Sequence, residues 1–369
     1  MLRVHSHKDF NNSMPLFLII NPGSTSTKLA LYDGDNERVS ESAGHSSDML
    51  AAFPKIPDQL GFRLAAADAF LEKHKVSAND LTAVVGRGGL LKPLEGGVYA
   101  VNDAMRNDLA SCRYGSHASN LGGLIAAQIA ARAGCPAFIV DPVVVDELDD
   151  IARLTGLPDI SRISIFHALN QKSVAREVAG AMGRRYENCR FIIAHLGGGI
   201  SVAAHLNGRA IDVNNALGGD GPFSPERAGS LPVFQLLDLA FSGKYSCESL
   251  KKRIVGGGGL VAHLGTNNLI EAMKRVNSGD AKARQVVEAM AYRIAREISS
   301  LGAALYGDVD RIIITGGLAN DDVFVSMIRA RVRYLAEVVV IPGENEMIAL
   351  ARGASAALNG TLTVKEYQS

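Results

Sequence analysis

Three short turns that contain glycine follow apolar stretches of the chain, and each gathers hydrogen-bonding groups in a small space. The first is NPGSTSTK at residues 21–28, whose polar side chains are those of Asn21, Ser24, Ser26 and Lys28. Phosphate oxygens accept several hydrogen bonds at once, so this turn suits a phosphate group. It is not a Walker A loop, since GxxxxGK[ST] occurs nowhere in the chain. A solvent-exposed polar hairpin is the alternative interpretation.

The other two turns carry few side chains. HLGGG places His195 before Gly197, Gly198 and Gly199, and ITGGLAN at residues 314–320 contains Gly317. Glycine lets the backbone come close to a polyphosphate, because no side chain stands in the way. A single glycine turn is weak evidence, but turns in repeated positions are stronger.

An internal repeat connects the first two turns. Residues 18–34 and 192–208 share one order: an apolar strand, a glycine turn, a short strand and a DG or NG turn. The glycines of the two segments align without a gap. Chance similarity between common hairpins is the alternative, but two domains that each open with this hairpin indicate duplication. A cleft between the copies is then the expected ligand site.

Two arginines and two carboxylates complete the set of candidate catalytic residues. Arg87 in VVGRGG is flanked by glycines, and Arg227 lies in GPFSPERAGS, a loop rich in Gly and Pro. A guanidinium group can hold a carboxylate or a phosphoryl group with two hydrogen bonds. Asp141 ends a predicted strand, where α/β sheets bind ligands. Asp141 and Glu346 would supply the carboxylates that Mg²⁺ takes beside phosphate oxygens. The alternatives are solvated loop arginines and, for Glu346, an ordinary first-turn helix acid.

The elements that must position these residues alternate between strands and helices, which predicts an α/β fold. Apolar runs predict strands at residues 16–21, 28–32, 83–85, 137–141, 190–194 and 311–315. Helical periodicity covers residues 58–75, 119–132, 167–182 and 281–306, and a last helix follows Glu346. Ser119 and Gly134 are the expected cap and stop of the second helix. Residues 86–97 are too rich in glycine for regular structure.

The length of 369 residues predicts two domains. We expect an N-terminal domain over 14–162 and a C-terminal, nucleotide-binding domain over 163–346, with residues 347–369 packing back on the first. Residues 1–13 read as a disordered leader, and Met14 as the natural start.

Composition limits the classes of partner. Lys and Arg number 38 and so do Asp and Glu, so the chain lacks the basic surface that nucleic acid or anionic lipid requires. No apolar run is long enough to span a membrane. Cys112, Cys135, Cys189 and Cys247 show no CxxC spacing, which indicates reduced thiols and a cytoplasmic protein.

The motifs together resemble the acetate kinase family, and several are typical of its butyrate and branched-chain members. The resemblance covers nearly the whole chain from Met14 onward and rests on INPGSTSTK, VGRGGLLKPLEGGVY, VDPVVVDEL, FHALNQKSVAR, HLGGGISV, GPFSPERAGSLP, GGGGLVAHLGT, ITGGLA and GENEMIALARGA. It implies two duplicated actin-like (ribonuclease H-like) domains. It also implies reversible phosphoryl transfer between ATP and a short fatty acid, a small-molecule carboxylate, giving ADP and an acyl phosphate. Mg²⁺ as cofactor and a homo-oligomer, dimer or larger, are implied in the same way.

The resemblance also assigns roles to the candidate residues. Asn21, Ser24, Ser26 and Lys28 match the first phosphate turn, His195 with Gly197–Gly199 the second, and Gly317 the adenosine-side turn. Arg87 and Arg227 match the pair that holds the acid and the transferring group, and Asp141 and Glu346 the magnesium-side acids. His167 enters as a catalytic candidate.

One departure from the family pattern concerns histidine. Acetate kinases have a second histidine four residues after the position of His167, and here that residue is Gln171. A neutral amide donates a hydrogen bond but adds no charge, so part of the stabilisation must come from elsewhere. We also expect Gly88 and Gly89 to leave room for a longer acid, where acetate kinases have bulkier residues. An acetate or propionate kinase and a non-catalytic, nucleotide-switched actin-like module remain the alternatives.

Overall fold

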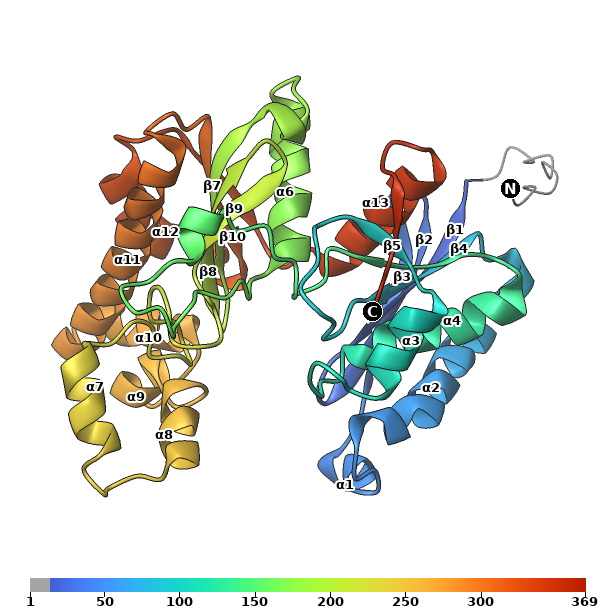
Figure 1. Ribbon diagram of the computed structural model, residues 1–369, viewed down its shortest axis with the longest axis horizontal. Coiled ribbons are helices and arrows are strands. Elements are labelled where there is room, and N and C mark those ends of the chain that lie inside the picture. Colours follow the sequence, from blue (N-terminus) through green and yellow to red (C-terminus); the bar gives the residue numbers. More distant parts are fainter. Residues whose placement is uncertain (1–13) are drawn as a thin grey trace. The chain divides into compact units, whose positions relative to one another are not determined.

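The computed structural model describes residues 14–369, and the contacts of this part divide it into two compact units (Figure 1). The first unit takes the described residues up to Lys92 together with Gly97–Pro142 and Glu346–Ser369; the second takes Pro93–Gly96 and Val143–Asn345. The contacts thus change over at residue 142, whereas the sequence predicts a boundary after residue 162, and the domain assignment remains a prediction. The expected leader at residues 1–13 lies outside the described residues.

The first unit is built on a seven-stranded sheet in the order β12-β5-β6-β4-β1-β2-β3. Its strands are β1 (Leu16–Pro22), β2 (Ser26–Asp33), β3 (Asn36–Gly44), β4 (Ala83–Arg87), β5 (Val98–Ala100), β6 (Ala137–Val140) and β12 (Val364–Glu366). Its helices are α1 (Ser47–Ala51), α2 (Leu60–Lys73), α3 (Asp103–Ala110), α4 (Asn120–Ala133) and α13 (Glu346–Leu358). Both α4 and α13 pack on β1, β4 and β6, so these central strands are covered.

The second unit is built on a five-stranded sheet in the order β11-β10-β7-β8-β9. Its strands are β7 (Arg190–Leu196), β8 (Ile200–Leu206), β9 (Arg209–Val213), β10 (Arg311–Gly316) and β11 (Val338–Pro342). Its helices are α5 (Asp150–Arg153), α6 (Ala168–Ala181), α7 (Val233–Ala240), α8 (Cys247–Ile254), α9 (Gly259–Leu264), α10 (Leu269–Asn277), α11 (Ala281–Leu301) and α12 (Asp322–Val332).

The two sheets repeat one topology. In each, three antiparallel strands are followed by two parallel ones: β3-β2-β1 continues into β4 and β6, and β9-β8-β7 continues into β10 and β11. The repeated segments of the sequence form the hairpins β1–β2 and β7–β8 at corresponding places. The predicted duplication of an α/β unit is therefore confirmed.

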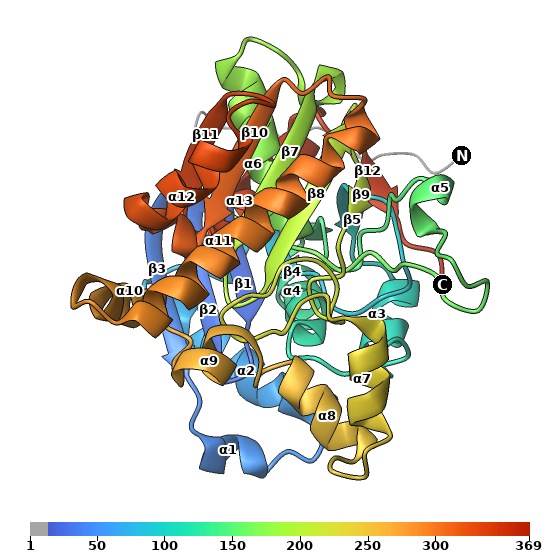
Figure 2. The same ribbon diagram turned by 90° about the vertical axis from the view of Figure 1, so that its left-hand side faces the viewer.

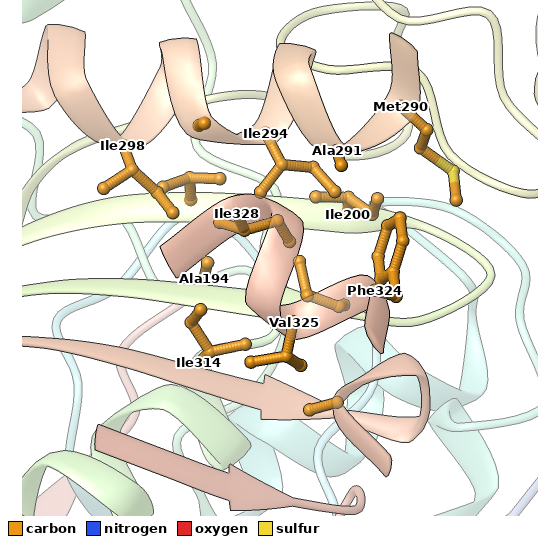
Figure 3. Packing of buried hydrophobic residues seen from close by; sticks show 14 of the residues in the cluster. Ala194, Ile200, Met290, Ala291, Ile294, Ile298, Ile314, Phe324, Val325 and Ile328 are labelled. Atoms are coloured by element: carbon orange, nitrogen blue, oxygen red, sulfur yellow. The ribbon is translucent and has the colours of Figure 1, made fainter. Parts of the chain in front are cut away.

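The second sheet is buried on both faces, because residues alternate sides along each strand. Ala194 of β7 and Ile314 of β10 face a cluster with α11 and α12, in which Ile294 and Ile328 also lie (Figure 3). The intervening strand residues pack against α6 instead. Figure 2 shows α11 running across this sheet. Apolar residues three and four apart on α11 form the stripe that this packing requires.

The predicted strands and main helices are present, with two differences in detail. Ser119 does not cap α4 through its side chain; its hydroxyl instead lies 2.8 Å from the ring of His117. Gly134 ends that helix as expected, with a φ of +66° that favours glycine. The predicted helix over 281–306 stops at Leu301, where the chain turns into a short 3₁₀ segment.

Candidate functional site

Four predicted residues gather at one edge of the first sheet. Asn21 lies near the end of β1, Arg87 is the last residue of β4, and Asp141 follows β6. These strands are parallel, so their carboxyl ends meet at the same edge, which is where α/β sheets bind ligands. The helix α13 packs on the same strands and begins with Glu346.

The carboxylate of Glu346 holds this cluster together. Arg87 Nη1 lies 2.5 Å from Glu346 Oε2, and Asn21 Nδ2 donates to the same oxygen at 2.7 Å. Asp141 is 1% exposed, and its Oδ1 accepts a hydrogen bond of 2.7 Å from the backbone N–H of Gly97. Its φ of +37° is rare for a residue with a side chain and marks backbone held in a strained conformation. The edge therefore carries one fixed guanidinium group and two fixed carboxylates.

These carboxylates fit a magnesium ion in number. Within residues 14–369, no group of three or more His, Cys, Asp or Glu side chains could hold a metal ion on its own. Mg²⁺ commonly takes only one or two carboxylates and keeps water and substrate phosphates as its other ligands. Asp141 and Glu346 would supply such a pair of carboxylates.

The first predicted phosphate turn connects β1 and β2. The backbone N–H of Gly23 donates to the carbonyl of Ser26 at 2.8 Å, which closes the turn. Ser24 and Lys28 are exposed there, and Ser26 is half-buried. The polar side chains are thus available to a ligand from solvent.

A buried arginine lies beneath this turn and was missed in the sequence. Arg63 of α2 is 0% exposed, and its guanidinium donates to the carbonyls of Ser26 at 2.8 Å and Ser24 at 3.3 Å. It also donates to the hydroxyl of Thr27 and the amide oxygen of Gln59. Burial lowers the pKa of Arg63. The arginine holds the carbonyls of the turn inward, and it adds positive charge below a predicted anion site.

A signal for Arg63 does exist in the sequence. It is four, seven and eight residues before Ala67, Phe70 and Leu71, all of which are buried on the same face of α2. An arginine in the middle of an apolar helix face must find internal acceptors. Neither its partners nor its place under the turn can be read from that pattern.

The second predicted phosphate turn and Arg227 are in contact within the second unit. A Cβ atom built on Gly199 would lie 1.7 Å from Arg227 Nη1, so only glycine fits there. The same Nη1 donates to the carbonyl of Ala216 at 2.5 Å, and burial lowers the pKa of Arg227. Ser224 Oγ donates to the carbonyl of Gly198 at 2.5 Å and fixes the turn further. The structure therefore joins two features that the sequence analysis proposed separately.

Two histidines stack beside this turn. The rings of His167 and His195 are nearly parallel, with centroids 3.9 Å apart. His195 lies one residue before the end of β7 and bonds Asn170, while His167 precedes α6 and bonds Ser201. Gln171 is wholly buried and also bonds Ser201. The side chain of Gln171 is therefore directed into the protein interior.

In the third turn, ITGGLAN, the second glycine is accessible. Gly317 begins a 3₁₀ segment after β10, and a Cβ atom there would meet nothing within 4 Å. The preceding Gly316 is the constrained one, with a φ of +92° and a carbonyl of Leu196 only 2.4 Å from its Cβ position. The backbone at Gly317 is thus accessible, as an adenosine-side turn requires.

The explanation expected for Gly88 and Gly89 is wrong. A Cβ atom on Gly88 would lie 2.5 Å from the Cβ of Pro142, and one on Gly89 would lie 2.5 Å from the Cα of Asn120. The space beside them is filled by the chain itself and is not open to extra methylenes. These glycines allow β4 and its loop to pack closely on α4 and β6.

The candidate residues are divided between the two units. Asn21, Ser24, Ser26, Lys28, Arg87, Asp141 and Glu346 belong to the first; His167, His195, Gly197, Gly198, Gly199, Arg227 and Gly317 belong to the second. Each unit brings its own set together around a hairpin turn or a sheet edge. The expected ligand cleft between the two copies stays a prediction. Among the helices of residues 14–369, none is long and apolar enough to cross a membrane.

Comparison with known proteins gives consistent matches. Residues 159–359 match the model of the Acetokinase family. The chain is 52% identical to a probable butyrate kinase of Coprothermobacter proteolyticus over 95% of this chain and 99% of the relative.

Solved structures share the fold at low sequence identity. An acetate kinase of Porphyromonas gingivalis has a TM-score of 0.72 at 18% identity and covers 91% of this chain and 98% of its own. An acetate kinase of Entamoeba histolytica has a TM-score of 0.73 at 14% identity, covering 92% and 98%. A propionate kinase of Francisella tularensis has a TM-score of 0.70 at 17% identity, covering 92% and 99%. The predicted actin-like fold class is confirmed.

Proposed function

The chain belongs to the acetokinase family, and from that premise we propose that it transfers the γ-phosphoryl group of ATP to the carboxylate of a short-chain fatty acid. The reaction is reversible and gives ADP and an acyl phosphate. Butyrate is the acid we propose first, because the relative at 52% identity is a probable butyrate kinase; branched acids of similar length come next.

The observation that carries this proposal is the contact of Arg227 with the glycine turn at Gly199. Backbone N–H groups of such a turn suit nucleotide phosphates. A guanidinium group fixed beside them can neutralise charge on a phosphoryl group during transfer. Burial of Arg227 strengthens that interaction, since water screens it less.

The chemistry needs no general base. A fatty acid carboxylate has a pKa of about 4–5 and is ionised at neutral pH. One of its oxygens attacks the γ-phosphorus in line, and the bond from that phosphorus to the bridging oxygen of ADP breaks. Catalysis then depends on positioning and on neutralising negative charge.

The candidate residues have distinct parts in this proposal. Arg87 and Arg227 hold the acid and the moving phosphoryl group, and His167 assists. Asp141 and Glu346 would hold Mg²⁺, which supplies charge neutralisation to the phosphates when bound. The nucleotide is bound by Asn21, Ser24, Ser26, Lys28, His195, Gly197, Gly198, Gly199 and Gly317.

A hydroxamate assay with ATP, Mg²⁺ and a series of acids tests the proposal. Arg227→Ala should lower kcat/KM for butyrate by about 2–4 kcal/mol of transition-state stabilisation, on the order of 30- to 1000-fold. Arg185→Ala is the matched control, because the Arg185 side chain is 78% exposed and pairs with its neighbour Glu187 at the surface. Near-normal turnover by Arg227→Ala would refute the assigned function of Arg227.

The same assay separates the alternative functions. A higher kcat/KM for acetate or propionate than for butyrate would identify a kinase of shorter acids. Binding of ATP without any acid-dependent turnover would instead indicate a nucleotide-switched module.

Assembly and location belong to the proposal as well. The helix α7 has no buried residue, and Phe234 within it and Phe241 directly after it are 81% and 86% exposed. Exposed aromatic side chains on one helix favour burial in a homo-oligomer. All four cysteines are free thiols, which suits a reducing cytoplasm.

A further inference from the structure

A chain of buried hydrogen bonds ends at His167 and involves side chains that the proposed reaction does not use. Tyr186 Oη lies 2.6 Å from His205 Nδ1, and His205 Nε2 lies 2.9 Å from Gln171 Oε1. Gln171 Nε2 lies 2.9 Å from Ser201 Oγ, which lies 2.9 Å from His167 Nδ1. The first four residues are at most 3% exposed, so water does not replace these bonds.

The amide of Gln171 sets the direction of the chain. Its Nε2 also donates to the carbonyl oxygen of Ser201 at 3.1 Å, and a carbonyl can only accept. The amide is therefore oriented with Oε1 toward His205, and Oε1 must accept from His205 Nε2–H. His205 is neutral with its proton on Nε2, and its Nδ1 accepts from the hydroxyl of Tyr186.

The other end of the chain fixes the ring of His167. Ser201 Oγ accepts from the amide of Gln171 and, at 3.4 Å, from the backbone N–H of His167. A hydroxyl has two acceptor sites and one hydrogen, so that hydrogen is donated to His167 Nδ1. A neutral His167 then carries its proton on Nε2.

His195, which stacks on His167, is held in the opposite tautomer. Asn170 Nδ2 donates to the backbone carbonyl of Glu344 at 2.6 Å, which turns Asn170 Oδ1 toward His195. Asn170 Oδ1 lies 2.8 Å from His195 Nδ1 and accepts its proton in a hydrogen bond. In its neutral form, His195 therefore has Nε2 as its unprotonated nitrogen.

Resting on the proposed phosphoryl transfer, we propose that Tyr186, His205, Gln171 and Ser201 are positioning residues. Together they hold His167 as the neutral Nε2–H tautomer, a hydrogen-bond donor, whereas Asn170 holds neutral His195 with Nε2 as an acceptor. Two imidazolium rings 3.9 Å apart would repel each other. A neutral His167 avoids that repulsion. This arrangement explains how an uncharged Gln171 serves where acetate kinases have histidine.

The charges around His205 also favour its neutral form. Burial lowers the pKa of His205 well below its usual value, and the positive charges of Lys172 and Arg176 lower it further. Lys172 is itself paired with Glu147 at 2.8 Å, and the hydroxyl of Tyr186 faces Nδ1 of His205. We therefore expect His205 to stay neutral near neutral pH.

Long-range ¹H–¹⁵N NMR of the full chain labelled with ¹⁵N-histidine tests the proposal directly. The coupling pattern to ring protons distinguishes the Nε2–H from the Nδ1–H tautomer, and single histidine variants assign the signals. We expect Nε2–H for His167 and His205 and Nδ1–H for His195 near pH 7.5. An Nδ1–H pattern for His167 in the unmodified protein would overturn the proposal without any variant.

Two variants test whether the buried chain of hydrogen bonds controls the tautomer of His167. Ser201→Ala removes the hydrogen donated to His167 Nδ1, and Gln171→Glu removes both amide donors. Each should give His167 a mixture of tautomers and lower kcat about tenfold, with KM for the acid little changed. Gln285→Glu makes the same amide-to-acid change at an exposed position on α11 and should alter neither property. An unchanged His167 tautomer in both variants would contradict the proposal.

The NMR result does not depend on catalysis. If the unmodified protein formed no acyl hydroxamate, the proposed function would fail while the tautomer measurement still decided this inference. If turnover were normal but the His167 tautomer were wrong, only this inference would fail.

Discussion

At the scale of single residues, Arg227 and Gly199 depend on each other. The guanidinium group occupies the space that any side chain at position 199 would need, and the carbonyl of Ala216 holds it there. Glycine at position 199 is therefore needed to make room for Arg227, and not only to let a phosphate come close. A glycine turn in a sequence does not reveal which of these two reasons applies.

Gly199→Ala should consequently act through Arg227. The added Cβ must push the guanidinium away, and kcat/KM should fall on the order of 100-fold, as for loss of one transition-state donor. Combining it with Arg227→Ala should cost little more than either change alone, since both remove the same contact. Steady-state kinetics of the single and double variants measures this.

Gly180→Ala is the control for that experiment. Gly180 lies within α6, where a Cβ atom meets nothing within 4 Å. The change should raise the free energy of unfolding by about 0.5–1 kcal/mol and leave turnover unchanged. Additive losses in the Gly199/Arg227 double variant would argue against the shared contact.

At the scale of elements, α11 carries a carboxyl group whose titration affects stability. Burial first, and the negative charge of Asp220 second, raise the pKa of Glu297 to about 6 from 4.5. The folded chain therefore binds this proton more tightly than the unfolded chain does. The resulting stabilisation is present at low pH and is lost as pH rises from about 4.5 to 6.

Glu297→Gln should remove this pH dependence. Above pH 6 the variant should unfold with a free energy up to about 2 kcal/mol higher, since one pKa unit corresponds to about 1.4 kcal/mol. At pH 4 the difference should disappear. Urea unfolding at both pH values measures it, with Glu288→Gln on the exposed side of α11 as control. If the two substitutions raised the free energy of unfolding equally, burial of Glu297 would not be the cause of the stabilisation.

The sequence predicts elements best where apolar periodicity is strong. The hydrophobic strands at Leu16–Pro22, Arg190–Leu196 and Arg311–Gly316 were predicted, as was their duplication. The three-residue strands Val98–Ala100 and Val364–Glu366 were not predicted, because three residues carry too little pattern and owe their conformation to their neighbours.

Candidate site residues were predictable where glycine or strand ends marked them. The close pairs Arg87–Glu346 and Arg227–Gly199 could not be foreseen, because each joins segments far apart in the sequence. The buried Arg63 was missed for the same reason: its acceptors are backbone carbonyls of another element. Side-chain chemistry can be read from a sequence, but the partner of a buried polar group is set by tertiary structure.

At the scale of the whole molecule, we expect α7 to be covered by another copy of the chain. Phe234→Ser should weaken that association, because it removes an aromatic side chain that is 81% exposed in the single chain. Size-exclusion chromatography with light scattering should then report a mass closer to the 39.1 kDa of one chain. Tyr306→Ser is the control, since Tyr306 is 97% exposed elsewhere. An unchanged mass for the Phe234 variant would show that α7 does not lie in the subunit interface.

The first unit is completed by residues from the opposite end of the chain. Helix α13 covers its central strands, β12 extends its sheet beside β5, and the hydroxyl of Tyr367 donates to Asp108 at 2.9 Å. During synthesis on the ribosome, residues 143–345 emerge before this helix and strand. The second unit can therefore reach its native state first. The sheet of the first unit stays partly uncovered until the last residues are translated. Cellular chaperones would encounter that partly uncovered sheet in every nascent copy.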